Sequence, residues 1–129
     1  MGFNPYKTKN MAISKESKIT INFGMDDKHV PEKITWQSTD DPGHSGINEA
    51  KGMLLSFFSE KDLDTVKIDL WTKDMKIDEM NLFMFQTLAS LSDTFFNSTK
   101  NTELANEMRS FVHHFGISTK VLVEDENKG

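Results

Sequence analysis

Residues 68–99, IDLWTKDMKIDEMNLFMFQTLASLSDTFFNST, decide the fold, because they end a strand, turn, and enter a long amphipathic segment. A surface helix normally carries a single apolar stripe. Residues 78–97 carry two apolar rows, so we expect this helix to pack between a sheet and a second element. The first row is Met80, Phe83, Met84, Leu88, Leu91 and Phe95, and the second row is Leu82, Phe85, Ala89 and Phe96.

Three upstream segments alternate between apolar and polar residues, as half-buried strands do. They are Lys18–Met25, Glu32–Thr39 and Thr65–Trp71. Pro31 cannot donate to a strand ladder, so it should open the second strand or lie on an edge. A polar loop joins the first two segments, and this pattern predicts a hairpin.

Residues 47–60 fit two secondary structures. Met53, Leu55 and Phe57 match a strand, and the polar turn that follows favours a second hairpin. Gly52 weakens the helical alternative. We predict a strand from about Met53 and keep a helix as the alternative. The helical stripe would be Ala50, Met53, Leu54, Phe57 and Phe58.

The central helix is predicted to begin at Asp78 as its N-cap. Ile77 before the cap and Leu82 inside the helix would then form a hydrophobic staple. Asn101 or Thr102 caps a last helix, and Gly116 is placed where a C-cap belongs. The apolar stripe of this last helix is Leu104, Met108, Phe111, Val112 and Phe115.

These elements predict an α+β fold, in which two C-terminal antiparallel helices pack on one face of a four-stranded antiparallel meander. We expect one domain over residues 17–123, a flexible tail at 1–16 and a charged tail at 124–129. Residues 117–123 could add a short strand or lie loosely on the core. Met11 is a second candidate for the start of the chain.

The composition disfavours several classes of function. The net charge is -5 and Arg109 is the single arginine, whereas nucleic acids and anionic membranes call for clustered basic residues. The chain has no cysteine, which removes disulfides and thiolate chemistry. No apolar run is long enough for a signal peptide or a membrane span, so we expect a cytoplasmic protein.

No group of residues specifies a reaction, a metal or a cofactor. Asp40, Asp41 and His44 lack a second histidine nearby, and we interpret them as a polar turn. His113 and His114 are adjacent and point to different sides of a helix. The acidic residues around the strand-to-helix turn lack the spacing of a calcium loop, so we interpret them as capping residues and a solvated rim. They are Asp69, Asp74, Asp78 and Glu79.

Asp93 falls near the second apolar row and would need a partner if it were buried. In an antiparallel helix pair that closes near Lys100, Asp93 lies level with Arg109, so we predict an ion pair between them; the alternative is that both are solvated. Contiguous exposed apolar surface often marks a partner site. We therefore predict an interaction surface, unless the last helix covers it, at Trp71, Leu82, Phe85 and Phe96.

Residues 19–116 resemble the GldC family of gliding-motility proteins of Bacteroidetes. The resemblance rests on IDLWTKDM at 68–75, SDTF at 92–95 and ELANEMRSF at 103–111, together with VPEKITW and AKGMLLSFF further upstream. It implies a small cytoplasmic accessory protein in bacteria whose gliding machinery is tied to type IX secretion. It supplies no catalytic residues.

Three hypotheses for the function follow. The first is a non-enzymatic adaptor that binds a protein of the motility machinery, or a second copy of itself. The second is a holdase-like chaperone with adaptable Met- and Phe-rich surfaces. The third is a small-ligand-binding domain with a pocket between the sheet and the helices.

Overall fold

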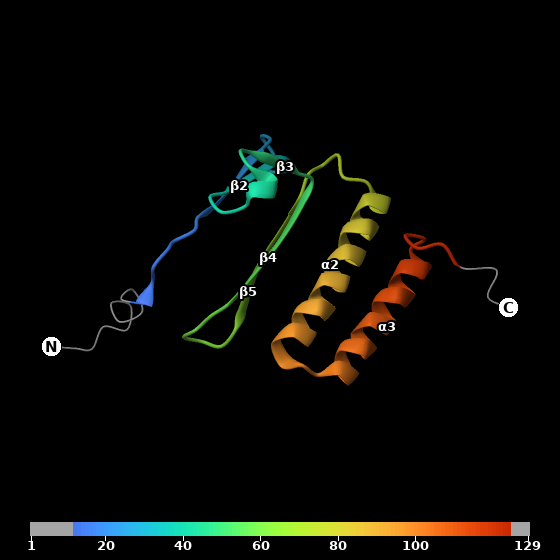
Figure 1. Cartoon of the computed structure of the whole chain (residues 1–129). Coiled ribbons are helices and arrows are strands. Elements are labelled where there is room, and N and C mark those ends of the chain that lie inside the picture. The colour runs from blue at the N-terminus through green and yellow to red at the C-terminus, as the bar shows by residue number, and fades with distance from the viewer. Residues whose placement is uncertain (1–11, 125–129) are drawn as a thin grey trace. The chain divides into compact units, whose positions relative to one another are not determined.

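The computed structural model describes residues 12–124, and within them the elements of an α+β protein (Figure 1). The described residues form two compact units, the first ending at Lys73 and the second beginning at Asp74. The predicted tails lie largely outside the described residues. The single domain over 17–123 and the packing of helices on one face of the sheet stay predictions.

The first unit begins with a three-stranded antiparallel sheet in the order β1-β2-β3. The strands are β1 (Ile19–Met25), β2 (Pro31–Ser38) and β3 (Asn48–Ala50), and a short 3-10 helix, η1 (Pro42–His44), precedes β3. The predicted hairpin of β1 and β2 is confirmed, and its register places Phe23 opposite Ile34. The predicted burial of one face of β1 is not found, because Ile19, Phe23 and Met25 are exposed. Ile34 has only 1% of its surface exposed and anchors the core of this unit.

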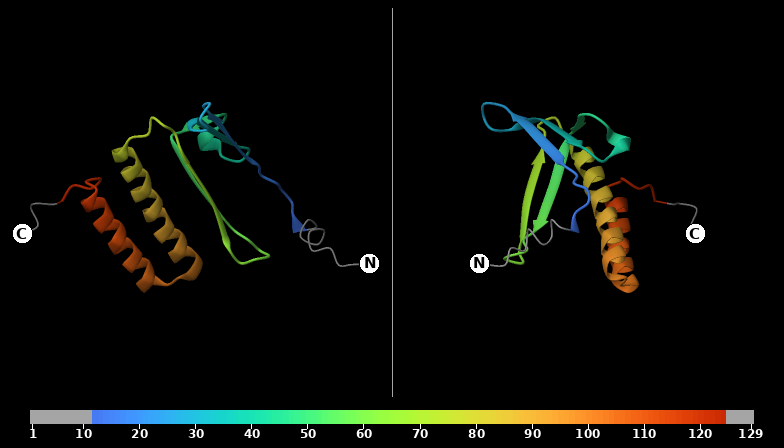
Figure 2. Two further views of the ribbon diagram at one scale, coloured as in Figure 1. Left: turned by 180° about the vertical axis from the view of Figure 1, so that it is seen from behind. Right: turned by 60° about the vertical axis from the view of Figure 1, so that its left-hand side comes forward.

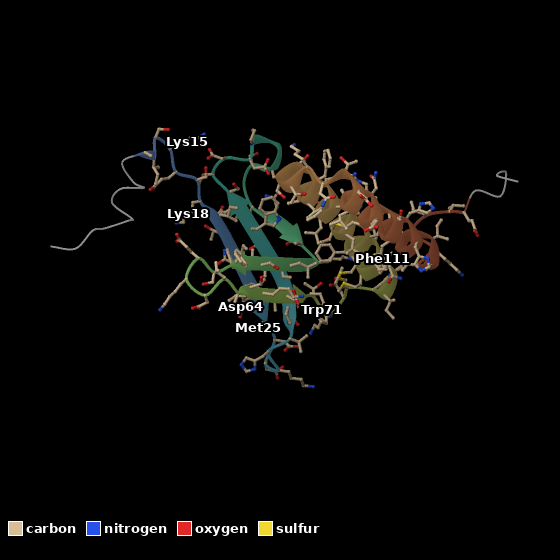
Figure 3. All side chains as sticks on the ribbon, turned by 90° about the horizontal axis from the view of Figure 1, so that it is seen from below. Lys15, Lys18, Met25, Asp64, Trp71 and Phe111 are labelled. Carbon is tan, nitrogen blue, oxygen red and sulfur yellow. The ribbon has the colours of Figure 1, made fainter. Side chains whose placement is uncertain are left out.

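The second half of the predicted meander is a separate two-stranded sheet formed by β4 (Gly52–Phe58) and β5 (Thr65–Trp71). The prediction of a single four-stranded sheet was therefore wrong, although all strand pairs are antiparallel. The predicted strand from Met53 exists, and β3 extends strand structure to Asn48, so the helical alternative for this segment is excluded. Figures 2 and 3 show the strands of the two sheets running in different directions.

The sequence explains why the ladder between β2 and β3 stops at Ala50. Its register pairs Ile34 with Ala50. One step further it would place Lys33 opposite Lys51, and like charges directly opposite each other are unfavourable. Two steps later Pro31 has no N–H to donate. Lys33 instead pairs with Glu49, at 3.1 Å between Nζ and Oε1.

At Lys51 the chain leaves the first sheet and enters the second. The Lys51 carbonyl accepts hydrogen bonds from the backbone N–H of Thr72, at 2.8 Å, and from the Thr72 hydroxyl, at 3.3 Å. Thr72 is 3% exposed, so its hydroxyl would be costly to leave without a partner. The break at Lys51 is thus a hydrogen-bonded junction.

Lys73 ties the end of β5 to the β1–β2 turn. Its N–H donates to the Pro31 carbonyl at 3.0 Å, and its ammonium group pairs with Asp26, at 3.3 Å, and with Glu32. Hydrogen bonds to Glu32 and Asp26 raise the pKa of Lys73 above its usual value. The pKa of Asp26 is lowered, first because the Val30 N–H donates to its carboxylate. The LWTK segment at 70–73 therefore holds the two sheets of this unit together.

The second unit contains two helices, α2 (Ile77–Thr99) and α3 (Thr102–Ser118), which lie side by side in an antiparallel pair (Figures 1 and 2). The predicted N-cap at Asp78 was wrong by two residues, because α2 is capped at Lys76. The Lys76 N–H donates to Glu79 Oε1 at 2.9 Å, so a carboxylate inside the first turn satisfies the backbone that precedes it. Ile77 is largely exposed and does not act as a staple.

The helix α2 has a polar flank in addition to its apolar rows. This flank is exposed, and it limits how far other elements can enclose the helix. Apolar docking along the whole of α2 is therefore a weaker explanation of this protein than the sequence suggested. The polar flank is formed by Gln86, Ser90, Asp93, Thr94 and Asn97.

The second apolar row of α2 packs against α3 through small residues. Ser92 is 1% exposed, and its hydroxyl donates to the Ala89 carbonyl at 2.7 Å. On α3 the buried residues are Ala105, Val112 and Gly116, which fall on one helical row. The predicted stripe is confirmed in part. Val112 is buried, and Met108 and Phe115 are half-buried, whereas Leu104 and Phe111 are exposed.

Gly116 lies inside α3 and does not end it, contrary to the predicted C-cap. A Cβ atom at this position would lie 2.6 Å from Phe85 Cε1 and 2.7 Å from Leu122 Cδ1. The helix ends at Ser118, and the Leu122 N–H returns to the Gly116 carbonyl at 2.9 Å. Residues 117–123 thus finish the helix and turn back over it, and they form no strand. The glycine permits both close contacts.

The substitution Gly116→Ala tests this packing. Alanine raises intrinsic helix propensity by about 1 kcal/mol, but overpacking a close seam costs about 1–3 kcal/mol, so we expect net destabilisation. Urea unfolding followed by the helical circular-dichroism signal measures the change. Gly24→Ala is the control, because a Cβ there meets nothing within 4 Å. An unchanged or raised stability of Gly116→Ala would show that the seam is not close-packed.

Candidate functional site

The free end of the β4–β5 hairpin exposes a group of large apolar side chains, which we call the hairpin tip: Phe57, Phe58 and Leu63. Their exposed fractions are 56%, 69% and 70%. Phe57 and Phe58 are adjacent in a strand, so they present apolar surface on both faces of the hairpin. The charged loop residues Glu60, Lys61, Asp62 and Asp64 surround them in sequence. An apolar centre with a polar rim is the usual anatomy of a protein–protein interface.

Leu63 has an unusual backbone conformation for a bulky residue, with φ of 53°. Hydrogen bonds of the loop hold it there: the Leu63 N–H donates to the Ser59 carbonyl at 2.9 Å, and the Ser59 N–H donates to the Asp64 carbonyl at 2.7 Å. Glycine or asparagine would occupy this conformation at lower cost. A strained and exposed leucine is an observation that favours a functional role.

The four residues of the predicted interaction surface differ in their exposure. Trp71, in the first unit, is 54% exposed at the end of β5 opposite to Asp64 (Figure 3). Leu82 is also exposed. Phe85 and Phe96 are half-buried. Phe85 approaches Gly116, and Phe96 lies beneath Arg109 of α3 and Lys100, the C-cap of α2. Sequence reasoning missed the hairpin tip, although Phe57 and Phe58 stood next to a turn signal.

The structure brings Asp93 and Arg109 together, with Arg109 Nη2 3.0 Å from Asp93 Oδ1. The two residues are level across the antiparallel helices, as the predicted geometry required. Burial is not the reason for their pairing, since the side chain of Asp93 is 67% exposed and Ser92 takes the place in the seam. Arg109 also donates to Asn106 Oδ1 at 3.2 Å and lies 5.6 Å from the ring centre of Phe96.

Across residues 12–124, no three His, Cys, Asp or Glu side chains form a group that could hold a metal ion. His44 Nδ1 lies 3.0 Å from Asp41 Oδ2, and the ring of His44 packs against Trp36 at 5.5 Å, so this pair closes the η1 turn. A depression in the first unit is lined by Lys18, Thr20, Gln37, Ser38, Thr39 and Gly46.

No helix within residues 12–124 combines the length and the apolar character needed to cross a membrane. The fold and surfaces described above define a small α+β protein whose most distinctive exposed features are apolar strands and loops. The model of the GldC-like family, described as gliding motility-associated protein GldC-like, matches residues 31–121, which is more than half of the chain. The chain therefore belongs to the GldC-like family of gliding motility-associated proteins, which is not a known enzyme family.

Searches of curated proteins and of solved structures found no match. The family match covers both sheets from β2 onward and both helices. It begins at Pro31 and therefore includes the Lys51–Thr72 junction and the helix seam.

The contribution of Arg109 can be separated into two parts. Asp93→Asn removes only a solvent-exposed ion pair and should cost less than about 1 kcal/mol of stability. Arg109→Ala also removes the cation–π contact with Phe96 and the bond to Asn106, so it should cost about 1–2 kcal/mol. Urea unfolding measures both changes. Equal effects of the two substitutions would contradict a role for Arg109 beyond the ion pair.

Proposed function

We propose that this chain is a non-enzymatic accessory protein of the gliding machinery that acts by binding a protein partner. The proposal places it in the cytoplasm of Bacteroidetes whose gliding machinery is linked to type IX secretion. Membership of the GldC-like family supports the role in motility. The acidic charge and the scarcity of arginine favour a protein partner over nucleic acid.

The single structural observation that carries the proposal is the hairpin tip. Three large apolar side chains are more than half exposed there, and one of them occupies a strained backbone conformation. Exposed apolar side chains add nothing to the stability of the free chain, whereas burying one in a complex contributes about 1.5–3 kcal/mol. A partner with an apolar pocket of matching size would gain most of its affinity from Phe58 and Leu63.

The position of the tip suits this role, because the hairpin loop is a rigid extension of two paired strands. The Ser59 hydroxyl accepts from the Asp62 N–H at 3.2 Å and adds a further internal bond to the loop. A pre-ordered loop loses little conformational entropy on binding. We therefore assign the partner-binding role to the tip in place of the predicted surface on α2.

The double substitution Phe58→Ser and Leu63→Asn tests the assignment. Both positions are exposed, and asparagine tolerates a positive φ, so the free chain should keep its stability within about 0.5 kcal/mol. We expect the variant to fail to restore spreading on agar to a strain that lacks the gene. Circular dichroism and thermal unfolding establish that the variant is folded.

The matched control is Ile47→Asn, which removes an apolar side chain that is 71% exposed outside the hairpin. The control should restore gliding as well as the unaltered chain does. If the folded tip variant also restores gliding fully, the tip is not the partner-binding surface.

A further inference from the structure

The strand β5 has one edge without a strand partner among the described residues. It pairs only with β4, in a two-stranded sheet. In an antiparallel ladder the backbone groups of successive residues point alternately toward the two edges. The bonds Ser59 N–H to Asp64 carbonyl and Thr72 N–H to Lys51 carbonyl fix which residues point toward β4. The backbone N–H and C=O groups of Val66, Ile68 and Leu70 therefore point toward β4, and those of the residues between them point toward the open edge.

The sequence of β5, TVKIDLW, is self-complementary about its central residue, Ile68. We propose that a second copy of this chain adds its β5 antiparallel to the first across this edge, with the twofold axis at Ile68. Lys67 of each copy then lies opposite Asp69 of the other, and Val66 lies opposite Leu70. Thr65 lies opposite Trp71, which is more than half exposed in the single chain. The product is a four-stranded sheet with two β4–β5 hairpins.

Charge selects this register among those that the backbone permits. Only residues of odd number present their N–H and C=O groups to the open edge, so permitted registers differ by two residues. A shift in one direction places Lys67 of one chain opposite Lys67 of the other, and a shift in the other direction places the two Asp69 residues opposite each other. Like charges directly opposite each other are unfavourable, and opposite charges are favourable. The register centred on Ile68 is the one that pairs both charges.

Lys67 and Asp69 already lie on one face of the strand, 2.7 Å apart between Nζ and Oδ2. In the proposed pair the two copies together bring four alternating charges into one cluster, which contributes more than isolated surface pairs do. Lysine on an edge strand usually discourages association with other strands. In this chain, Lys67 would disfavour pairing with strands that lack a matching acid, whereas β5 of a second copy places Asp69 opposite it.

The opposite face of the hairpin supplies a physical reason for the association. Isolated two-stranded sheets are marginally stable, and additional strands with a shared apolar face stabilise them. That face is continuous across the hairpin, and Phe57, Val66 and Ile68 on it are substantially exposed. Pairing through β5 would extend it into one larger apolar surface. The residues of the face in each copy are Met53, Leu55, Phe57, Val66, Ile68 and Leu70.

The other edge strands fit self-pairing less well. The strand β1, ITINFGM, carries no charge and its ladder is interrupted between Gly24 and Met25, so it has no means of fixing a register. The strand β4, GMLLSFF, is also uncharged and begins with a glycine, which weakens strand pairing. Opposite charges symmetric about the centre occur in β5 alone among the strands of residues 12–124.

Cysteine cross-linking tests the register directly, since the chain has no cysteine of its own. Ile68 lies opposite itself in a non-hydrogen-bonded pair, where Cα atoms are about 4.5 Å apart and within the range of a disulfide. Ile68→Cys should form a covalent dimer on mild oxidation of the purified chain. Lys67→Cys is the control, because its counterpart is Asp69 and not another cysteine. Equal cross-linking of the two variants, or no cross-linking of Ile68→Cys, would overturn the proposal.

Charge reversal tests the pairing without a covalent bond. Lys67→Glu and Asp69→Lys should each weaken the dimer by about tenfold or more, measured by sedimentation equilibrium, because each places like charges opposite one another. Lys61→Glu in the hairpin loop makes the same change of charge as Lys67→Glu and should leave the dimer unchanged. Mixing the two weakened variants should restore association, because each copy then supplies the charges that the other needs.

The mixing experiment separates lost pairing from lost folding, since two misfolded chains would not restore a dimer of defined mass. A dimer that is unaffected by either charge reversal, or a mixture that stays monomeric, would contradict pairing through β5. The experiment uses only the purified chain, so its outcome is independent of the gliding assay of the hairpin tip.

Discussion

Lys51 lies between β3, which belongs to the first sheet, and β4, which belongs to the second, and its carbonyl accepts the hydrogen bonds that hold this junction. Before it, β3 pairs with β2; after it, β4 pairs with β5, and Thr72 secures the change with two hydrogen bonds to that carbonyl. This division frees β4–β5 to form a ribbon of its own. The exposed tip, the open edge of β5 and the apolar face of the hairpin all follow from it.

In the second unit, the close packing of the two helices depends on small residues. Ser92, Ala105 and Gly116 lie at the contact between α2 and α3, where large side chains would hold the helices apart. Interaxial distances in helix pairs are set by the residues at the contact. One side of α2 carries a row of exposed polar residues, so apolar residues do not surround this helix completely.

Much of the architecture could be predicted from local patterns. The existence of β1, β2 and β5, the existence of both helices and the pairing of Asp93 with Arg109 across them follow from periods of two and 3.6 residues. The split at Lys51 could not, because it depends on which residues meet across strands once a register is set. The seam of α3 was found only in part for a related reason. The hydrophobic pattern correctly includes Val112 but also includes Leu104 and Phe111, which are exposed. Close approach of the helices selects the small residues Ala105 and Gly116, which the pattern does not include.

The candidate functional surfaces also could not be predicted from local sequence patterns alone. Sequence reasoning placed the interaction surface at Trp71 and on the most apolar helix. Trp71 and Leu82 are exposed, but Phe85 and Phe96 are half-buried. The hairpin tip and the edge of β5 become visible only when exposure, backbone conformation and pairing are known together. Both features belong to the β4–β5 ribbon, which the GldC-like family match includes.

The open edge of β5 is the claim on which the account rests most heavily, and amide hydrogen exchange measured residue by residue tests it most directly. In a dilute sample the N–H groups of Val66, Ile68 and Leu70 should be protected by β4, whereas those of Lys67 and Asp69 should exchange rapidly. Raising the concentration of the chain should slow exchange at Lys67, Asp69 and Trp71, whose N–H groups face the open edge, and should leave exchange at Val66, Ile68 and Leu70 unchanged. Protection of Lys67 and Asp69 equal to that of Ile68 at the lowest concentration would show that another part of the chain covers this edge, and would contradict the account.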